Sequence, residues 1–501
     1  MTLRVTNTLT GETEPFEPDD PDTVTLYLCG LTTSDPPHLG HARTWVHTDV
    51  IHRWLAHEGY DVRHVENFTD VNEKIVARVG ESGPDGTSLG ADESAVAETY
   101  IGEVIDAMRA LNLERADVYP RVSEHVPEII EMVETLIDRG HAYEVDGSVY
   151  FDVTSFEDYG ALSNQDVDAL SAQGDPEELS EKRNAADFAL WKAGGVEAAE
   201  IESHQHEGAA PATEACKTAQ TWESPWGEGR PGWHIECSAM STTHLGETFD
   251  IHVAGQDIIF PHNENEIAQS EAATGEPFAR YWVHVRLLET KGEKMSSSLG
   301  NFATVGDAVA EHGPNAIRTF LLSTSYSNRA TFSEETIQEG IDRWERLARG
   351  YERAVTAADS TAAATKVTDD ELRAAIENTR ADATASMNDD FNTRGALAAL
   401  LELVGAVHDH VDAHEEYDYQ ALRESIDVFD EFGGDALGLQ FGASGGSDEL
   451  TEDLVEYVLR LRADAREAGE YERADALRDS LAELGVEVED TDDGVTYRID
   501  D

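Results

Sequence analysis

The chain has 501 residues, of which 40% are hydrophobic, 102 are acidic and 36 are Lys or Arg, giving a formal net charge of -66. This length and apolar content exclude a disordered chain and predict two to four domains with hydrophobic cores. The acidity excludes nucleic-acid binding through a broad basic surface, so any such binding must use a few placed arginines.

The chain begins with a predicted hairpin in residues 1–23, followed by an apolar run at 24–28 that predicts a short buried strand. A turn rich in proline and glycine then leads into a helix that begins at His38 and continues through Leu55. A second strand, a polar loop and a helix follow at 60–79. This order is typical of a parallel α/β fold, and a strand, a tight turn and a helix start form a natural phosphate-binding site.

The middle of the chain alternates helices and strands, with one irregular segment. Residues 194–223 are rich in Ala, Glu and His, contain Cys216 and show no clear period, which predicts a linker or insertion. The regular elements are predicted at 91–111 (helix), 126–137 (helix), 145–152 (hairpin), 249–253 (strand), 263–273 (helix) and 281–288 (strand), before a polar loop at 290–301.

From about residue 315 the pattern changes to long amphipathic helices, which predicts an α-helical bundle. A flexible linker is predicted at 443–447, and a small hairpin around Asp493 and Gly494 closes the chain. The helices are predicted at 316–323, 334–358, 369–387, 394–411, 421–429, 454–468 and 471–484.

Cysteine usage and charge indicate the cellular setting. Three scattered cysteines (Cys29, Cys216 and Cys237) do not form a disulfide framework, and neither a signal peptide nor a membrane-spanning run is recognisable. We therefore expect a cytoplasmic protein with no membrane partner. A charge of -66 destabilises a compact chain by self-repulsion unless salt screens it, which predicts a cytoplasm at molar salt rather than a merely acidic protein.

Four residues form a candidate zinc site. His262 and Glu266 stand four positions apart, so a helix places them on one face, and Cys29 and Cys237 offer two soft sulfur donors. No CxxC pair supports the set. Two alternatives therefore stay open, because isolated cysteines often fill apolar cores and a His–Glu pair can be an ordinary surface pair. Competing donors are His234, His252 and Glu264.

Two segments predict a nucleotide site. His38 and His41 flank Gly40 at a helix start, where glycine permits close approach of a nucleotide and imidazoles can donate to phosphate oxygens. The alternative is that a histidine only caps the helix. Lys291 and Lys294 are two of seven lysines in the chain, which favours a polyanion such as triphosphate over an ordinary solvated loop.

One further carboxylate extends this nucleotide site. Gly255 and Asp257 follow a predicted strand, so Asp257 can reach ribose hydroxyls at the carboxyl edge of the sheet.

The combination of HLGH at 38–41 with KMSSS at 294–298, in an α/β pattern followed by helices, resembles a class I aminoacyl-tRNA synthetase. Longer stretches resemble the cysteinyl-tRNA synthetase family in particular, and the likeness covers almost the whole chain. These stretches lie at 27–30, 67–70, 230–240, 260–269 and 474–478.

The resemblance implies three domains within an α/β fold. The first is a Rossmann-like parallel-sheet catalytic domain at 1–314, which includes a connective insertion at about 110–225. An α-helical bundle of the DALR type follows at 315–442, and a small α+β anticodon-binding domain occupies 448–501. A monomer is the expected oligomeric state.

The implied activity is ATP-dependent ligation of L-cysteine to tRNA(Cys) through a cysteinyl-adenylate, with Mg2+ accompanying ATP. The resemblance implies one Zn2+ bound by Cys29, Cys237, His262 and Glu266. A soft zinc ion accepts a thiolate far better than the hydroxyl of serine, so cysteine can be selected without editing. The other implied positions are His38, His41 and Lys294 for catalysis, Gly40, Gly255, Asp257, Lys294 and Ser297 for ATP, and Thr69, Trp233 and His252 for cysteine.

Two positions depart from the family pattern. Ser297 stands where the family usually has a second lysine, so Lys294 alone, Lys294 with Lys291, or high potassium must serve the phosphates. Asn263 stands where the family commonly has a second histidine after His262, which leaves the predicted ligand pair intact.

Arginines concentrate in the last 50 residues, at Arg460, Arg462, Arg466, Arg473 and Arg478. Pairing with neighbouring acidic residues is one explanation, and the anticodon-binding domain implied by the resemblance is the other. The residues expected to contact tRNA bases are Arg466, Asp475, Asp490 and Tyr497, of which Tyr497 can stack on a base.

Two rival functions remain at the level of sequence. A cysteine-adenylating ligase that transfers cysteine to an amino-sugar would not need residues 448–501, and their presence argues against it. A non-catalytic tRNA-binding or zinc-binding module would not need an intact HLGH motif, the zinc donors and Lys294.

Overall fold

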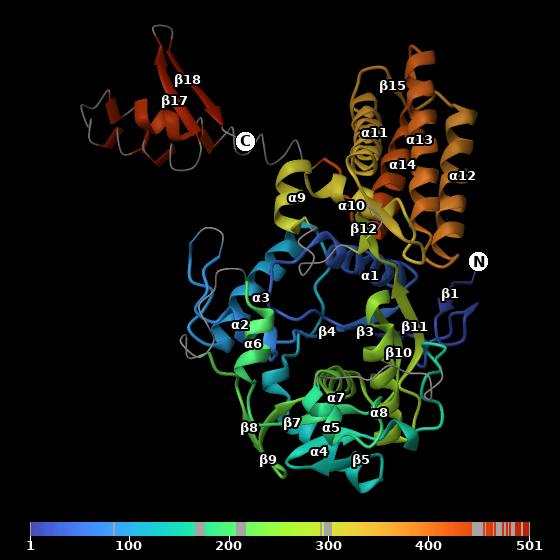
Figure 1. Cartoon of the computed structure of the whole chain (residues 1–501). Coiled ribbons are helices and arrows are strands. Elements are labelled where there is room, and N and C mark those ends of the chain that lie inside the picture. The colour runs from blue at the N-terminus through green and yellow to red at the C-terminus, as the bar shows by residue number, and fades with distance from the viewer. Residues whose placement is uncertain are drawn as a thin grey trace. The chain divides into compact units, whose positions relative to one another are not determined.

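The computed structural model describes residues 2–83, 86–165, 176–206, 217–290, 293–294 and 303–442, together with parts of 454–499. The described parts of 454–499 are 454–455, 457–463, 465–466, 473–474, 477–478, 480–481, 486–491 and 494–499. The chain forms two compact units, Met1–Leu439 and Gln440–Asp501 (Figure 1).

A four-stranded parallel sheet of order β11-β10-β3-β4 lies at the centre of the first unit (Figure 1). Its strands are β3 (Thr23–Leu28), β4 (Asp61–Glu66), β10 (Phe249–Gly255) and β11 (Ala279–Val285). Six of the seven residues of β10 are buried, as expected for a parallel strand covered on both faces. The predicted parallel α/β fold is confirmed.

The connections of this sheet create a place for a ligand. Helix α1 (Leu39–His57) joins β3 to β4, whereas α8 (Glu264–Thr274) lies between β10 and β11. The chain therefore leaves the adjacent strands β3 and β10 toward opposite edges of the sheet. The carboxyl ends of two such strands border a topological switch point, where open α/β sheets bind ligands.

Between β4 and β10 in the sequence, the chain forms a separate five-stranded antiparallel sheet of order β5-β6-β7-β9-β8. Its hairpin turns at Asp146 and Gly147, which both have positive φ as a tight hairpin turn requires, and this confirms the predicted hairpin. The strands are β5 (Ala142–Val145), β6 (Ser148–Phe151), β7 (Phe188–Ala193), β8 (Trp222–Ser224) and β9 (Gly227–Pro231), and α4 (Val126–Asp138) and α7 (Trp233–Leu245) accompany them.

Three sequence predictions need correction. The single strand expected at 281–288 is two, because β12 (Leu288–Thr290) leaves the parallel sheet to pair with β13 (Glu293–Lys294) and β14 (Ala330–Phe332). Helix α9 (Val305–His312), capped by Thr304, was not predicted, because eight residues give too little periodicity. Helix α6 (Ala198–His204) lies in the supposedly irregular segment and buries only Ile201.

The remaining elements before residue 264 are short, except for helix α3 (Glu93–Ala110), which has 18 residues. They are β1 (Arg4–Asn7), β2 (Glu12–Pro15), α2 (Glu73–Arg78), α3 (Glu93–Ala110), η1 (Val122–Glu124), η2 (Val153–Ser155), α5 (Pro176–Glu181), η4 (Gln256–Ile258) and the π-turn η5 (Ile259–Asn263).

The helices predicted between residues 316 and 429 are confirmed, whereas those predicted at 454–468 and 471–484 lie partly outside the described residues. The longest, α11 (Glu334–Ala358), begins at a capping box formed by Ser333 and Thr336, which supplies partners for otherwise orphaned amides. The bundle consists of α10 (Pro314–Leu322), α11, α12 (Asp370–Met387), α13 (Thr393–Ala413), α14 (Tyr419–Val428) and η7 (Phe429–Ala436), with the short strands β15 (Ala363–Ala364) and β16 (Tyr417–Asp418) between them.

The second unit ends in the predicted hairpin, formed by β17 (Val486–Thr491) and β18 (Gly494–Ile499). Val455, Leu481 and Val486 form a small apolar cluster there. The predicted linker at 443–447 lies outside the described residues. Among the described helices, none is long and apolar enough to cross a membrane.

Candidate active site

Two thiols and one imidazole converge beside the carboxyl ends of β3 and β10. Cys29 follows β3 and donates its backbone N–H to the carbonyl of Val253 on β10 (3.1 Å). Cys237 comes from α7 and His262 from η5. The Cys29 Sγ lies 3.6 Å from the Cys237 Sγ and 3.4 Å from the His262 Nε2. Residues separated by more than two hundred positions therefore form one cluster of soft donors.

The geometry of this cluster fits a zinc ion. Zn–S bonds of about 2.3 Å in a tetrahedral site hold two sulfurs about 3.8 Å apart, whereas a disulfide would hold them at about 2.05 Å. The observed 3.6 Å between the sulfurs of Cys29 and Cys237 matches the first arrangement and excludes the second.

Glu266 lies beside this cluster rather than within it. Its Oε2 is 3.7 Å from the Nε2 of His262, one helical turn away, so the predicted shared face exists. The same carboxylate accepts a hydrogen bond from Asn263 (2.6 Å) and faces the Nε2 of His252 at 3.3 Å. Of the four residues predicted to bind zinc, Cys29, Cys237 and His262 place donor atoms within 4.8 Å of one another.

The competing donors have other partners. His234 lies with its Nδ1 3.0 Å from the Nδ1 of His262, so it fixes the ring that faces Cys29. His252 is fully buried and stacks on Trp282 with 4.2 Å between ring centroids. Glu264 accepts hydrogen bonds from the backbone of Gly160 and Ser163, away from the thiols.

Protonation of the thiols is unequal. A hydrogen bond from Cys29 and the nearby His262 lower the pKa of Cys237 to about 6, although burial opposes them. The same hydrogen bond, together with burial, raises the pKa of Cys29 well above its ordinary value. Burial lowers the pKa of His262, but Glu266 and Cys237 outweigh it and raise that pKa overall. Of the two thiols, Cys237 is therefore the one whose surroundings favour the thiolate form.

The predicted cysteine-contacting residues surround this cluster. The indole of Trp233, at the start of α7, lies 4.4 Å from the His262 ring, and it is 40% exposed, so one face is open to a ligand. Thr69 is buried in the loop after β4, where its carbonyl accepts hydrogen bonds from the backbone N–H and the hydroxyl of Thr33. Neither contact with substrate is tested, so both assignments stay predictions.

Sequence reasoning assigned no role to Asn67 or Tyr27, yet both shape the cluster. The Asn67 Oδ1 accepts hydrogen bonds from the Tyr27 hydroxyl and the Gly30 backbone, both at 2.8 Å, and lies 3.7 Å from the Cys237 Sγ. A Cβ at Gly30 would stand 1.6 Å from the Asn67 carbonyl oxygen, so only glycine fits there. The polar sequence directly after a predicted strand was the available signal.

The histidines in the first turn of α1 combine the two roles considered from the sequence, which are capping the helix and facing a nucleotide. His38 caps the helix, and His38 and His41 exchange hydrogen bonds between ring Nδ1 and backbone N–H at 3.3 Å. Their rings stack with 3.7 Å between centroids. The cap is therefore real, and it fixes both imidazoles at the positive end of the helix dipole with Gly40 between them.

The lysine-containing segment returns to this same turn. After residue 302, the carbonyl of Ala303 accepts from Leu39 (3.0 Å) and Val305 donates to Pro37 (2.9 Å). Lys294 belongs to β13, where its backbone pairs with Glu289, whereas Ser297 and Lys291 lie outside the described residues. The end of the predicted phosphate-binding segment is thus tied to both sides of His38.

Gly255 and Asp257 lie at the carboxyl edge of the sheet as predicted. Gly255 is the last residue of β10, and Asp257 follows in η4 with an exposed side chain. A Cβ on Gly255 would meet the Asp257 carboxylate at 2.7 Å, so the glycine allows the turn that brings this carboxylate to the edge.

The predicted anticodon residues belong to the second unit. Arg466 is an exposed helical residue. Asp490 lies on β17 and Tyr497 on β18, where the register pairs Asp490 with Val495 and Val488 with Tyr497. Asp475 lies outside the described residues, as does Cys216 in the catalytic unit.

A second group of metal-capable side chains does not form a metal site. His410 Nδ1 and His414 Nδ1 lie 2.6 Å and 3.8 Å from one oxygen of Asp369. The Nε2 of His410, however, accepts the backbone N–H of Asp418 at 3.0 Å, so its Nδ1 carries the proton that bonds Asp369. The group instead ties the start of α12 to the end of α13.

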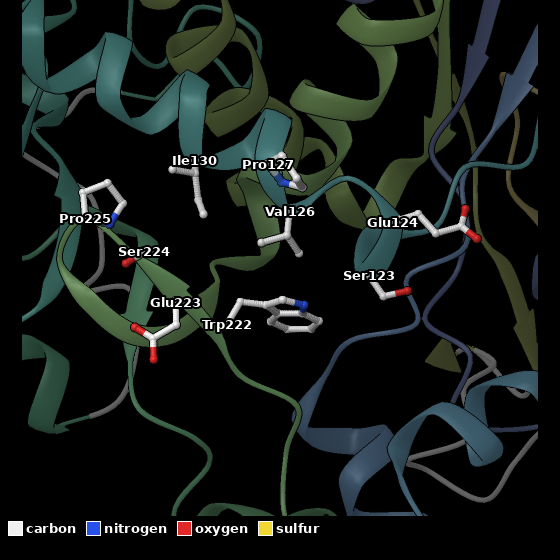
Figure 2. Close-up of a pocket in the computed structure, with 9 residues that line it drawn as sticks. All are labelled: Ser123, Glu124, Val126, Pro127, Ile130, Trp222, Glu223, Ser224 and Pro225. Atoms are coloured by element: carbon white, nitrogen blue, oxygen red, sulfur yellow. The ribbon is translucent and has the colours of Figure 1, made fainter.

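A pocket of about 710 Å³ lies between α4 and β8 (Figure 2). Figure 2 shows Val126, Pro127 and Ile130 of α4 on one wall and the Trp222–Pro225 segment on the other. Ser123, one of the lining residues, donates hydrogen bonds from its backbone N–H and its hydroxyl to the carboxylate of Asp70, the residue that follows Thr69. No residue predicted for catalysis or binding lines it.

Comparison with family models covers nearly the whole chain. A model described as the catalytic domain of class I (C) tRNA synthetases matches residues 15–342, a DALR domain matches 384–442, and a cysteinyl-tRNA ligase anticodon-binding domain matches 447–498.

Similar proteins agree with these models. A cysteine–tRNA ligase of Haloarcula marismortui is 67% identical, with 100% of both chains covered. Another, of Halobacterium salinarum, is 61% identical over 99% of this chain and 100% of its own. A methionyl-tRNA synthetase of Mycobacterium tuberculosis solved with methionyl-adenylate is similar in fold, with a TM-score of 0.57, 17% identity and coverage of 83% and 90%.

Proposed function

The chain belongs to the cysteine–tRNA ligase family of class I synthetases, and from this premise we propose how its residues select cysteine and activate it. It is a ligase that charges tRNA with cysteine, using ATP. The observation that carries the residue assignments is the convergence of Cys29, Cys237 and His262 beside the same sheet edge as the capped His38 and His41.

Cysteine selection rests on the thiol cluster. We propose that Cys29, Cys237 and His262 hold one Zn2+, with Glu266 as the fourth ligand, and that His252 and Asn263 orient Glu266. When bound, the ion supplies a soft coordination position that favours a thiolate over a hydroxyl. Trp233 covers the substrate from its exposed side and Thr69 from the loop after β4.

Activation takes place at the first turn of α1. ATP binds there with Mg2+, and its phosphates lie against the helix N-terminus, Gly40, His38 and His41, while Gly255 and Asp257 hold the ribose. The cysteine carboxylate attacks the α-phosphate and pyrophosphate leaves. His38, His41 and Lys294 stabilise the charge that develops on the phosphates, and Ser297 contacts the same group.

Transfer to tRNA completes the reaction. The terminal adenosine hydroxyl of tRNA(Cys) attacks the carbonyl of cysteinyl-adenylate, and AMP leaves. We propose that the C-terminal domain at 448–501 reads the anticodon through Arg466, Asp475, Asp490 and Tyr497, with stacking on Tyr497. The catalytic domain at 1–314 and the bundle at 315–442 complete the proposed organisation of a cytoplasmic monomer.

The experiment that tests these assignments is ATP–pyrophosphate exchange in about 3 M KCl, where charge repulsion is screened. We expect exchange with cysteine and none above background with serine. Transfer of labelled cysteine to tRNA, and not to an amino-sugar, distinguishes the synthetase from the sugar ligase. ATP–pyrophosphate exchange at the same rate with cysteine and with serine would refute the proposed selection of cysteine by its thiol.

Lys294→Ala tests the phosphate-binding segment. We expect this variant to lose about 100-fold or more in the rate of exchange, because Ser297 leaves the segment without a second lysine at that position. Lys366→Ala, which removes a lysine from the helical bundle, is the control. Near-normal exchange in Lys294→Ala would show that other groups neutralise the triphosphate.

A further inference from the structure

The segment rich in Ala, Glu and His packs against one small helix of the catalytic core. We call its described residues, 194–206 and 217–223, the insert. Ile201 of α6 forms an apolar cluster with Val76 and Ala77 of α2, and Val196, Ala198 and Ala219 pack around it. Helices α2 and α6 lie side by side (Figure 1). The insert therefore covers α2 rather than projecting into solvent.

Buried polar contacts tie the insert to both ends of α2. At one end, the Lys217 Nζ donates to the carbonyl of Ala77 and lies 3.1 Å from Glu81, with only 2% of its side chain exposed. At the other end, Glu93 accepts from the backbone of Gln220 (2.6 Å) and of Asn72, the N-cap of α2 (2.9 Å). Burying one of the chain's seven lysines in this way is costly unless the charge is paired.

The insert also reaches the segment that leads into the nucleotide site. Asp35 lies three residues before His38, and its carboxylate pairs with Arg78 at 3.0 Å. Arg78 in turn donates to the backbone carbonyl of His204 in the insert. His206 then lies between two carboxylates, with Nε2 3.2 Å from Asp35 and Nδ1 2.9 Å from Glu81.

The chain between Asp35 and His38 is stiff. Pro36 and Pro37 restrict φ, and the carbonyl of Pro37 accepts from Val305 at 2.9 Å. On the other side, Thr33 is bonded to the carbonyl of Thr69 at 3.1 Å. A displacement of Asp35 is therefore passed to the capped histidines instead of being absorbed by the loop.

We propose that the insert is a clamp that positions the adenylation segment, residues 31–41, and that His206 is the positioning residue that closes it. This inference rests on the proposed function for its kinetic consequences and on the contacts above for its structural ones. Both ring nitrogens of His206 face carboxylate oxygens, and both can donate only in the imidazolium form. The imidazole thus spans the two carboxylates, with Nδ1 on Glu81 and Nε2 on Asp35.

Two carboxylates and their cations surround His206. The acidic groups that face it are Asp35 and Glu81, and Tyr100 of α3 lies near the same carboxylates. The cations are Arg78, on Asp35, and Lys217, on Glu81. Each carboxylate therefore has its own cation, and His206 bridges two ion pairs that would otherwise be independent.

Three variants of the full-length protein in molar KCl test the clamp. His206→Ala removes both bonds, and we expect kcat/KM for ATP in cysteine-dependent exchange to fall about tenfold, with KM for cysteine unchanged. His206→Arg keeps two donors and a permanent charge, so it should restore activity to within about twofold. Ser203→Ala is the matched control, because among the described residues its hydroxyl bonds only the Glu200 carbonyl, within the insert itself.

Amide hydrogen exchange separates a positioning role from a loss of activity alone. Amide hydrogen exchange of residues 31–41, which requires no activity, should be faster in His206→Ala than in Ser203→Ala. Equal rates of amide hydrogen exchange and equal kinetics of ATP–pyrophosphate exchange in these two variants would overturn the proposed clamp. A wild-type protein without cysteine-dependent ATP–pyrophosphate exchange would instead overturn the proposed function. Amide hydrogen exchange would still test the clamp in that case.

Discussion

Buried carboxylates of this protein titrate in opposite directions according to their partners. Burial raises the pKa of Glu66 to about 8, because the Trp45 indole, its hydrogen-bond donor at 2.8 Å, offsets little of the desolvation. Glu266 is equally buried, but His252 and His262 outweigh its burial and lower its pKa. Partners rather than burial therefore decide which carboxylate is charged and able to bind a cation.

Glu66→Gln should stabilise the protein increasingly as pH rises. The pKa of Glu66 rises from 4.5 to about 8 on folding. The favourable contribution of Glu66 to the free energy of unfolding is therefore complete below pH 4.5 and is lost as the pH rises through 8. We expect the variant to exceed the wild type in free energy of unfolding by about 2–4 kcal/mol at pH 8 and by much less at pH 5. Denaturant titrations at both pH values in molar KCl measure this difference.

The control for that comparison is Glu98→Gln, since the Glu98 side chain is 65% exposed and its ion pair with Arg121 is long at 4.0 Å. A difference between Glu66→Gln and the wild type that does not change with pH would contradict the raised pKa of Glu66.

Cys237→Ser should abolish binding of the proposed zinc ion. Serine lacks the thiolate that this position provides, so zinc measured by elemental mass spectrometry should fall from about one to below about 0.1 per chain. Cys216→Ser should keep its zinc, because we assign Cys216 no part in the cluster. Full zinc in Cys237→Ser would refute the proposed ligand set, and zinc loss in Cys216→Ser would extend it.

Single buried arginines hold the helical elements together. Arg318 of α10 bonds Asp49 of α1, and it also donates to the carbonyls of Leu111 after α3 (2.9 Å) and Leu437 after η7 (2.6 Å). One side chain thus joins the first helix of the parallel sheet to the last turn of the bundle. An amphipathic sequence pattern does not reveal such a contact, because it predicts the apolar face of a helix and not which carboxylate or carbonyl a buried arginine reaches.

Arg318→Met should cost about 3–5 kcal/mol, because it leaves Asp49 buried with Arg53 as its remaining cation and several carbonyls without donors. Arg349→Met removes an exposed pair with Glu345 on α11 and should cost below about 0.5 kcal/mol. Urea unfolding of both variants in molar KCl gives the two values. Similar losses in the two variants would show that the buried arginine contributes no more than a surface one.

Net charge dominates the behaviour of the molecule as a whole. With 102 acidic residues against 36 Lys and Arg, the folded chain repels itself, and the relatives at 67% and 61% identity come from Haloarcula marismortui and Halobacterium salinarum. The same repulsion acts on tRNA, whose counterion release contributes little at high salt. Stacking and shape must then carry more of the recognition of tRNA.

The unfolding temperature should therefore rise with salt. Between about 0.1 M and about 3 M KCl the Debye length falls from about 10 Å to below 3 Å, which removes most long-range repulsion. Thermal unfolding followed by circular dichroism measures the change, with sucrose at equal osmolality as the control for general exclusion effects. An unfolding temperature that is independent of KCl would contradict a stability limited by charge.

The sequence by itself determined the class of fold and most of the elements, because hydrophobic periodicity and turn residues act locally. It predicted the strand ending at Leu28, the helix beginning at His38, the closing hairpin and the long helices of the bundle, and the structure confirms each. It also predicted the cysteines and histidines that share a site, through long motifs that resemble a family. Short elements such as α9 and α6 escaped, since seven or eight residues show no reliable period.

Only the tertiary structure decided which donors meet. Cys29 and Cys237 are 208 positions apart, and no local rule places them 3.6 Å from each other. The strand order β11-β10-β3-β4 brings Cys29 beside β10, and helix α7 carries Cys237 to the same place. The structure likewise turned a segment without apparent function into a set of contacts around Asp35 and His206. Such contacts depend on which surfaces pack together, and that is a property of the whole chain.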